Sequence, residues 1–110
     1  MKIAVLVDDL FFSSKISAVS KQVGSEVVFC RGAAVVPPDV ERICVDLNAG
    51  SFDAVEEIRK LKASHSAPIL AYVSHVQVDL KRQAEAAGAD EVMARSAFVE
   101  RLSKILAGDH

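Results

Sequence analysis

Three carboxylates, one hydroxyl and one guanidinium follow or close short apolar runs in this sequence: Asp8, Asp9, Asp46, Ser74 and Arg95. Carboxylates packed together repel one another unless a cation neutralises them, and hard oxygen ligands favour Mg²⁺. A carboxylate beside bound Mg²⁺ can attack a phosphoryl group, while a hydroxyl and a guanidinium can bind its oxygens. For any single acid, the alternative is that it caps a helix or faces solvent. The set predicts a site only if the fold brings its members together.

The elements that would position these residues alternate along the chain. Apolar runs that read as strands lie at 2–7, 26–30, 42–46, 68–73 and 90–94. Stripes of helical period lie between and after them: Phe12, Ile16, Val19 and Val23; Val55, Ile58 and Leu61; Leu80, Ala84 and Ala87; and Phe98, Leu102 and Ile105. Nearly continuous apolar strands are typical of a parallel sheet covered by helices on both faces.

We therefore predict an α/β, flavodoxin-like three-layer sandwich with a five-stranded parallel sheet in the order 2-1-3-4-5. Ligands bind such sheets at the carboxyl ends of the strands, where the five polar residues stand. One segment departs from the alternation of strands and helices. Residues 31–41 are too few for a full helix with its loops, and they contain Pro37 and Pro38. We expect the second helix to be absent or reduced to one turn.

Composition limits the classes of function. The chain has 110 residues, of which 51% are hydrophobic and 25% charged, as expected for a single domain over 1–110. A net charge of −2, no Trp and few aromatic residues argue against direct nucleic-acid binding. The N-terminus reads as neither a signal peptide nor a membrane span, which predicts a cytoplasmic location and no membrane partner. Cys30 and Cys44 lie in apolar runs, and we expect buried, reduced thiols.

Over nearly its whole length the chain resembles the receiver domain of bacterial response regulators. The motifs that carry the resemblance are VLVDDL at 5–10, ICVDLN at 43–48, PILAYVS at 68–74 and AEAAGADEVMAR at 84–95. The resemblance implies that Asp8, Asp9 and Asp46 bind Mg²⁺, with a backbone carbonyl from Asn48. It also implies that Asp46 is the phosphoacceptor and that Ser74 supplies the hydroxyl.

Several family positions are occupied by other residues. Arg95 replaces the family's Lys; it keeps the charge, but its planar group is not equivalent to an ammonium. Ser96 replaces the following Pro, and Val92 replaces the aromatic residue that switches on phosphorylation. His75 and Gly50 stand where the family has a small residue and a Pro. The pattern predicts a retained acidic site with an altered readout.

The leading interpretation is a stand-alone, atypical response regulator and not an enzyme. A histidine kinase or phosphotransfer protein would phosphorylate Asp46, and the chain would dock onto a downstream protein or a dimer mate, unless it is a fragment of a longer protein. The alternative is a pseudo-receiver, an interaction module that does not use phosphate. A third class, a small flavodoxin-like enzyme or cofactor binder, lacks a glycine-rich phosphate loop after the first strand.

Overall fold

Strands and helices alternate along the chain in the computed structural model, which describes residues 1–75 and 77–108. The strands are β1 (Lys2–Leu6), β2 (Glu26–Cys30), β3 (Arg42–Asp46), β4 (Ile69–Val73) and β5 (Glu91–Ala94). The helices are α1 (Leu10–Val23), α2 (Ala54–Ser64), α3 (Val78–Ala87), α4 (Arg95–Glu100) and α5 (Leu102–Ala107). All five predicted strands are present, within a residue of their expected ends.

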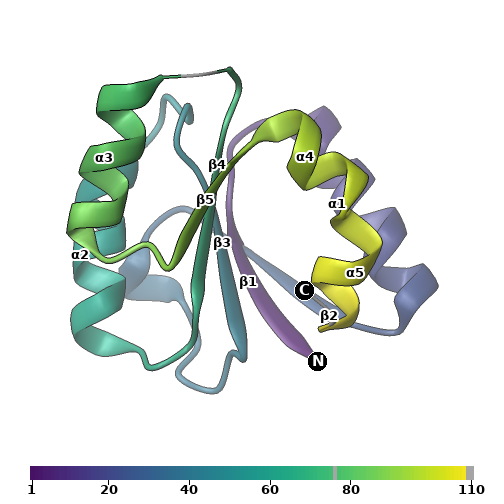
Figure 1. Cartoon of the computed structure of the whole chain (residues 1–110). Coiled ribbons are helices and arrows are strands. Elements are labelled where there is room, and N and C mark those ends of the chain that lie inside the picture. The colour runs from purple at the N-terminus through teal and green to yellow at the C-terminus, as the bar shows by residue number, and fades with distance from the viewer. Residues whose placement is uncertain (76, 109–110) are drawn as a thin grey trace.

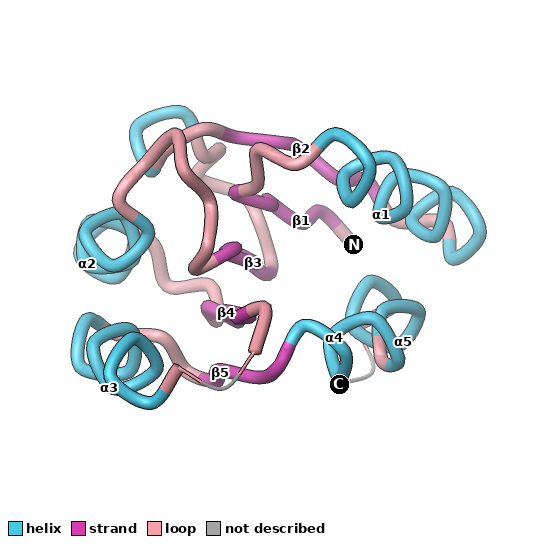
Figure 2. Tube along the Cα trace, turned by 90° about the horizontal axis from the view of Figure 1, so that it is seen from above, coloured by secondary structure: helices cyan, strands magenta, loops and turns pink. Residues whose placement is uncertain are grey.

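The strands form one parallel sheet in the order β2-β1-β3-β4-β5, which confirms the predicted fold. Helices α2 and α3 cover one face of the sheet, and α1, α4 and α5 cover the other (Figures 1 and 2). Because every strand is parallel, all carboxyl ends lie at one edge, which we call the carboxyl edge. The polar residues that follow the strands are therefore gathered there.

Alternate residues of each central strand pack into two separate apolar clusters. In β1, Ala4 and Leu6 face α2 and α3, whereas Ile3 and Val5 face α1, α4 and α5. All four side chains are fully buried. This two-sided burial is the reason that the central strands read as continuous apolar runs and not as alternating ones.

The connection between β2 and β3 contains only one 3₁₀ turn, η1 (Ala33–Val35), as predicted for the reduced second helix. The Glu57 carboxylate on α2 accepts the Ala33 N–H at 2.9 Å and so holds this turn against the helix. Of the five residues of this edge strand only Cys30 is buried, and Phe29, which lies on the α1 face in register with Val5, is 42% exposed.

The C-terminal helical segment is divided in two. At Arg101 the backbone leaves the helical region (φ −95°, ψ 4°), and this separates α4 from α5. The predicted apolar stripe is still continuous in space, because Phe98, Leu102 and Ile105 are all buried against the sheet.

Both cysteines are buried free thiols, as expected. Burial raises the pKa of the Cys44 thiol to about 12 and also raises the pKa of Cys30. Among the helices of the described ranges, none has the length and apolar character needed to cross a membrane.

Candidate functional site

Asp46 is the buried acid at the carboxyl edge, with only 6% of its surface exposed. Its Oδ1 accepts the backbone N–H of Asn48 at 2.8 Å. Burial raises the pKa of Asp46 above its ordinary value, and the charges of Asp8 and Asp9 add to this rise. The Asn48 N–H and the Arg95 guanidinium act in the opposite direction but do not cancel it. The ionised carboxylate is therefore poorly compensated and would be stabilised by an added cation.

Asp9 has two structural partners. It is the N-cap of α1, and its Oδ1 accepts the N–H groups of Phe11 and Phe12 at 3.0 and 3.1 Å. Its Oδ2 accepts a hydrogen bond from Arg95 Nη2 at 3.2 Å. The Phe12 N–H and then Arg95 lower the pKa of this carboxyl. Both oxygens are thus already engaged within the protein.

Asp8 connects the end of β1 to the loop after β3. Its Oδ2 accepts the N–H groups of Gly50 and Ser51, both at 2.9 Å. These bonds, that of Ser51 above all, lower the pKa of Asp8 and keep it ionised. Asp8 therefore holds the loop that begins just after Asp46.

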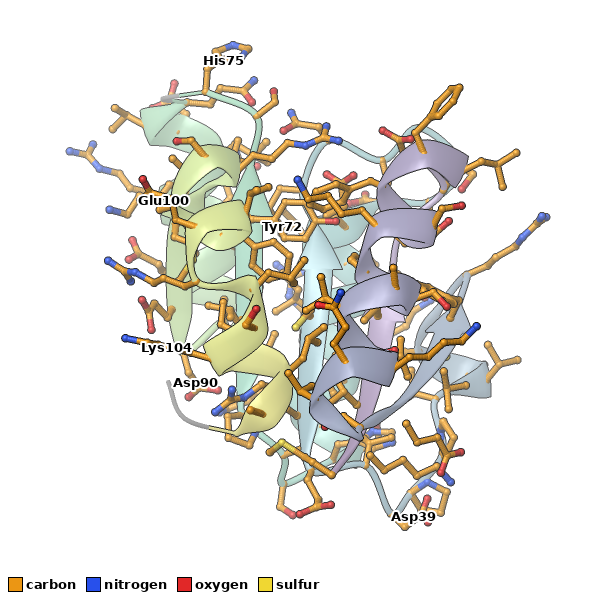
Figure 3. The ribbon with its side chains drawn as sticks, turned by 90° about the vertical axis from the view of Figure 1, so that its right-hand side faces the viewer. Asp39, Tyr72, His75, Asp90, Glu100 and Lys104 are labelled. Atoms are coloured by element: carbon orange, nitrogen blue, oxygen red, sulfur yellow. The ribbon has the colours of Figure 1, made fainter. Side chains whose placement is uncertain are left out.

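The side chain of Asn48 joins the loop after β3 to the segment after β4. Its Oδ1 accepts the backbone N–H of Ser74 at 2.6 Å, and its Nδ2 donates to Gln77 Oε1 at 2.8 Å. Ser74 Oγ and His75 Nδ1 lie 3.2 Å apart, within hydrogen-bond reach. His75 itself projects at the carboxyl edge, far from Asp39 and Asp90 at the opposite end of the sheet (Figure 3).

An aromatic cluster lies directly beneath the site. The Arg95 guanidinium stacks over the Phe12 ring at 4.2 Å from its centroid. Phe12 meets Tyr72 edge-on at 5.3 Å, and Tyr72 stacks on Phe98 at 4.3 Å. Tyr72 is fully buried between the two groups of helices on this face (Figure 3), and no hydrogen-bond partner for its hydroxyl exists among the described residues.

The fold brings the predicted residues to one edge, but it arranges them differently from a ready-made metal site. Within ranges 1–75 and 77–108, no three acidic, histidine or cysteine side chains are placed to hold a metal ion together. The donor chemistry nevertheless suits a hard divalent cation at Asp46, because its Oδ2 accepts no hydrogen bond from the described part of the chain. Asp9 would have to leave Arg95 to take part. The Mg²⁺ ligand set of Asp8, Asp9, Asp46 and Asn48 stays a prediction.

Sequence reasoning missed two participants. Gln77 gave no signal, because a glutamine before a helix has many roles and its partner lies in another loop. Phe12 was recognised only as a core residue. Its role under Arg95 follows from the packing of α1 against the start of α4, which no local pattern encodes.

No protein-family model matches the sequence, and no curated protein matches it. Solved structures do match over nearly the whole chain. A response regulator from Burkholderia pseudomallei, crystallised with a phosphorylated aspartic acid, calcium ion and citrate, has a TM-score of 0.77 and 22% identity, covering 98% of this chain and 72% of that one. A two-component response regulator from Clostridium difficile has a TM-score of 0.80 and 12% identity over 96% of this chain and 94% of its own. A receiver domain protein from Clostridium thermocellum has a TM-score of 0.80 and 16% identity over 98% and 92%.

The chain therefore has the fold of the response regulator receiver domain.

Proposed function

We propose that this chain is an atypical receiver domain that accepts a phosphoryl group on Asp46 in two-component phosphorelay signalling. The observation that carries the proposal is the state of Asp46, a buried carboxylate at the end of β3 with one hydrogen-bonded oxygen and a raised pKa. Functional carboxylates are often found in such environments. The domain would comprise residues 1–110, act in the cytoplasm and serve as a signalling module and not as an enzyme.

The phosphoryl donor would be a histidine kinase or a phosphotransfer protein that carries phosphohistidine. Asp46 Oδ2 attacks phosphorus, a P–O bond forms, the P–N bond breaks, and the imidazole leaves and takes up a proton. Arg95 lies close enough to lower the pKa of Asp46 and can supply positive charge to the transferred group. Ser74 offers a hydroxyl at the end of the neighbouring strand.

A divalent cation, which we propose to be Mg²⁺, would be held by Asp46 and Asp8 with the Asn48 carbonyl. When bound, it would screen charge between the carboxylates and the phosphoryl oxygens. Without a metal ion, Arg95 already neutralises part of this negative charge, because it pairs with Asp9. We therefore expect weaker Mg²⁺ binding than a site with three unengaged carboxylates would show.

The second candidate is a pseudo-receiver that binds a downstream protein, or a second copy of itself, without phosphate. The engagement of both Asp9 oxygens favours it, as does Val92, which is buried in β5 and carries no ring. Both candidates have the same fold, so only chemistry at Asp46 separates them.

The deciding experiment is incubation with Mg²⁺ and a small phosphoramidate donor, followed by intact mass measurement. We expect a mass increase of one phosphoryl group that Asp46→Asn abolishes. Asp39→Asn is the matched control, because Asp39 lies at the opposite end of the sheet (Figure 3). If the wild-type chain and Asp46→Asn both remain unmodified, the phosphoacceptor proposal is wrong and the pseudo-receiver is favoured.

A further inference from the structure

The amide side chains of Asn48 and Gln77 form a bridge across the carboxyl edge through atoms that the proposed metal and phosphoryl contacts do not use. Asn48 accepts from the Ser74 N–H at 2.6 Å and donates to Gln77 Oε1 at 2.8 Å. We call these two side chains the amide clamp. A primary amide carries its donor and its acceptor on two separate atoms, whereas an ionised Asp at position 48 could only accept and would lose the bond to Gln77.

The clamp is anchored to Asp46. The backbone N–H of Asn48 donates to Asp46 Oδ1 at 2.8 Å, so the main chain of Asn48 is held by the acid while its side chain holds the segment after β4. A continuous set of hydrogen bonds therefore runs from Asp46 through Asn48 to Ser74 and Gln77. Together with the pairing of Asp46 and Tyr72 between β3 and β4, this set places Ser74 relative to Asp46.

Gln77 is also the last residue before α3. Its side chain makes no capping bond to the helix, unlike the Ser, Thr, Asp or Asn that is preferred at this position. Its carbonyl accepts the Lys81 N–H at 2.9 Å, which is the first hydrogen bond of α3. The side chain of Gln77 is thus committed to Asn48, while its main chain begins the helix.

We propose that Gln77 is a positioning residue for the Asp46 site, acting through the side-chain amide of Asn48. It fixes Ser74 beside Asp46 and joins the start of α3 to the same unit. The effect on phosphoryl uptake rests on the proposed function, whereas the clamp itself can be tested in the unmodified protein.

The first experiment is amide hydrogen exchange of the unmodified full chain, with the Lys81 N–H as the probe. A net hydrogen bond of ordinary strength corresponds to about a fivefold change in an equilibrium. We expect exchange at Lys81 to be about fivefold faster in Asn48→Ala and Gln77→Met. Gln77→Glu keeps an acceptor for Asn48 Nδ2 and should behave like the wild type. The double variant Asn48→Ala/Gln77→Met should exchange no faster than the single variants.

Gln83→Met is the matched control, because Gln83 is exposed on the same helix but is not the partner of Asn48. If the Lys81 N–H exchanges at the same rate in Gln77→Met as in the wild type, the proposed clamp is wrong. Equal acceleration in Gln83→Met would overturn it too, because any change on α3 would then suffice.

The second experiment measures the rate of phosphoryl uptake from phosphoramidate, with Mg²⁺ present. Gln77→Met should slow uptake about fivefold, and Gln77→Glu should restore it, a result that a purely structural role of the helix start does not explain. If uptake occurs and is the same in all Gln77 variants, the positioning role is wrong while the proposed function stands. If even the wild-type chain takes up no phosphoryl group, the proposed function fails, and hydrogen exchange at Lys81 alone decides on the clamp.

Discussion

The stacking of Arg95 on Phe12 should contribute a measurable coupling free energy. The guanidinium lies 4.2 Å from the ring centroid, Phe12 is 5% exposed, and the Arg95 side chain is 36% exposed. Cation–π contacts contribute about 0.5–1 kcal/mol at exposed sites and about 2 kcal/mol when desolvated. Because one partner is buried and the other is partly hydrated, we expect about 1 kcal/mol.

The perturbation is a double-mutant cycle with Arg95→Met and Phe12→Leu. Arg95→Met keeps an unbranched apolar stem, and Phe12→Leu keeps an apolar core residue while removing the ring. Unfolding in denaturant can be followed by the fluorescence of Tyr72, because it is the single tyrosine and the chain has no Trp. Its contact with Phe12 makes it sensitive to this cluster.

Two controls separate stacking from the ion pair with Asp9. Arg95→Lys keeps the charge but loses the planar stack, so it should recover little of the coupling. Added salt screens the ion pair between Arg95 and Asp9, but the coupling free energy between Arg95 and Phe12 should keep most of its value. A coupling below about 0.3 kcal/mol, the scatter expected for independent sites, would refute the reasoning.

Three further predictions concern single side chains. Asp46→Asn should raise the free energy of unfolding at neutral pH by on the order of 1 kcal/mol, because it removes a poorly compensated buried charge. Since the pKa of Asp46 is raised in the fold, the wild type loses stability as pH rises above 3.8 through the folded pKa, and denaturant titrations should show the two proteins converging in acid. Tyr72→Phe should leave thermal stability unchanged or raise it by up to about 1 kcal/mol, because its hydroxyl has no partner in the described chain; a clear loss would reveal one. Glu57→Ala should lower stability by about 1 kcal/mol through loss of its bond to Ala33, whereas Glu57→Gln, which keeps the acceptor, should lose far less in the same assay.

The sheet could be predicted from the sequence, because strands that are buried on both faces consist of nearly continuous apolar residues. The central strands are nearly continuous apolar runs, and the order 2-1-3-4-5 is one of the common orders of a doubly wound parallel sheet with right-handed connections. The shortened second helix was also predictable, since 31–41 cannot hold a helix with its loops. The break at Arg101 was not, because its flanking residues keep a helical apolar stripe on both sides.

The site was predictable as a gathering of residues but not as a set of contacts. Strand ends place Asp8, Asp9 and Asp46 at one edge whatever their partners. Asp9 caps α1 with one oxygen and pairs with Arg95 through the other, and this arrangement depends on tertiary packing between α1 and the start of α4. The partner of Asn48 lies in a different loop, and such pairings have no local sequence signal.

The edge position and low burial of β2 have a consequence for the order in which the strands separate. Parts of a protein with few buried apolar contacts exchange their amide protons through local openings that cost less than global unfolding. β2 is an edge strand with one strand neighbour, and only Cys30 of its five residues is buried, so it should be the first strand to separate. Such an opening would bare the outer edge of β1, the strand that leads into Asp8 and Asp9. The least protected strand of this protein is therefore directly beside the strand that supplies its acidic pair.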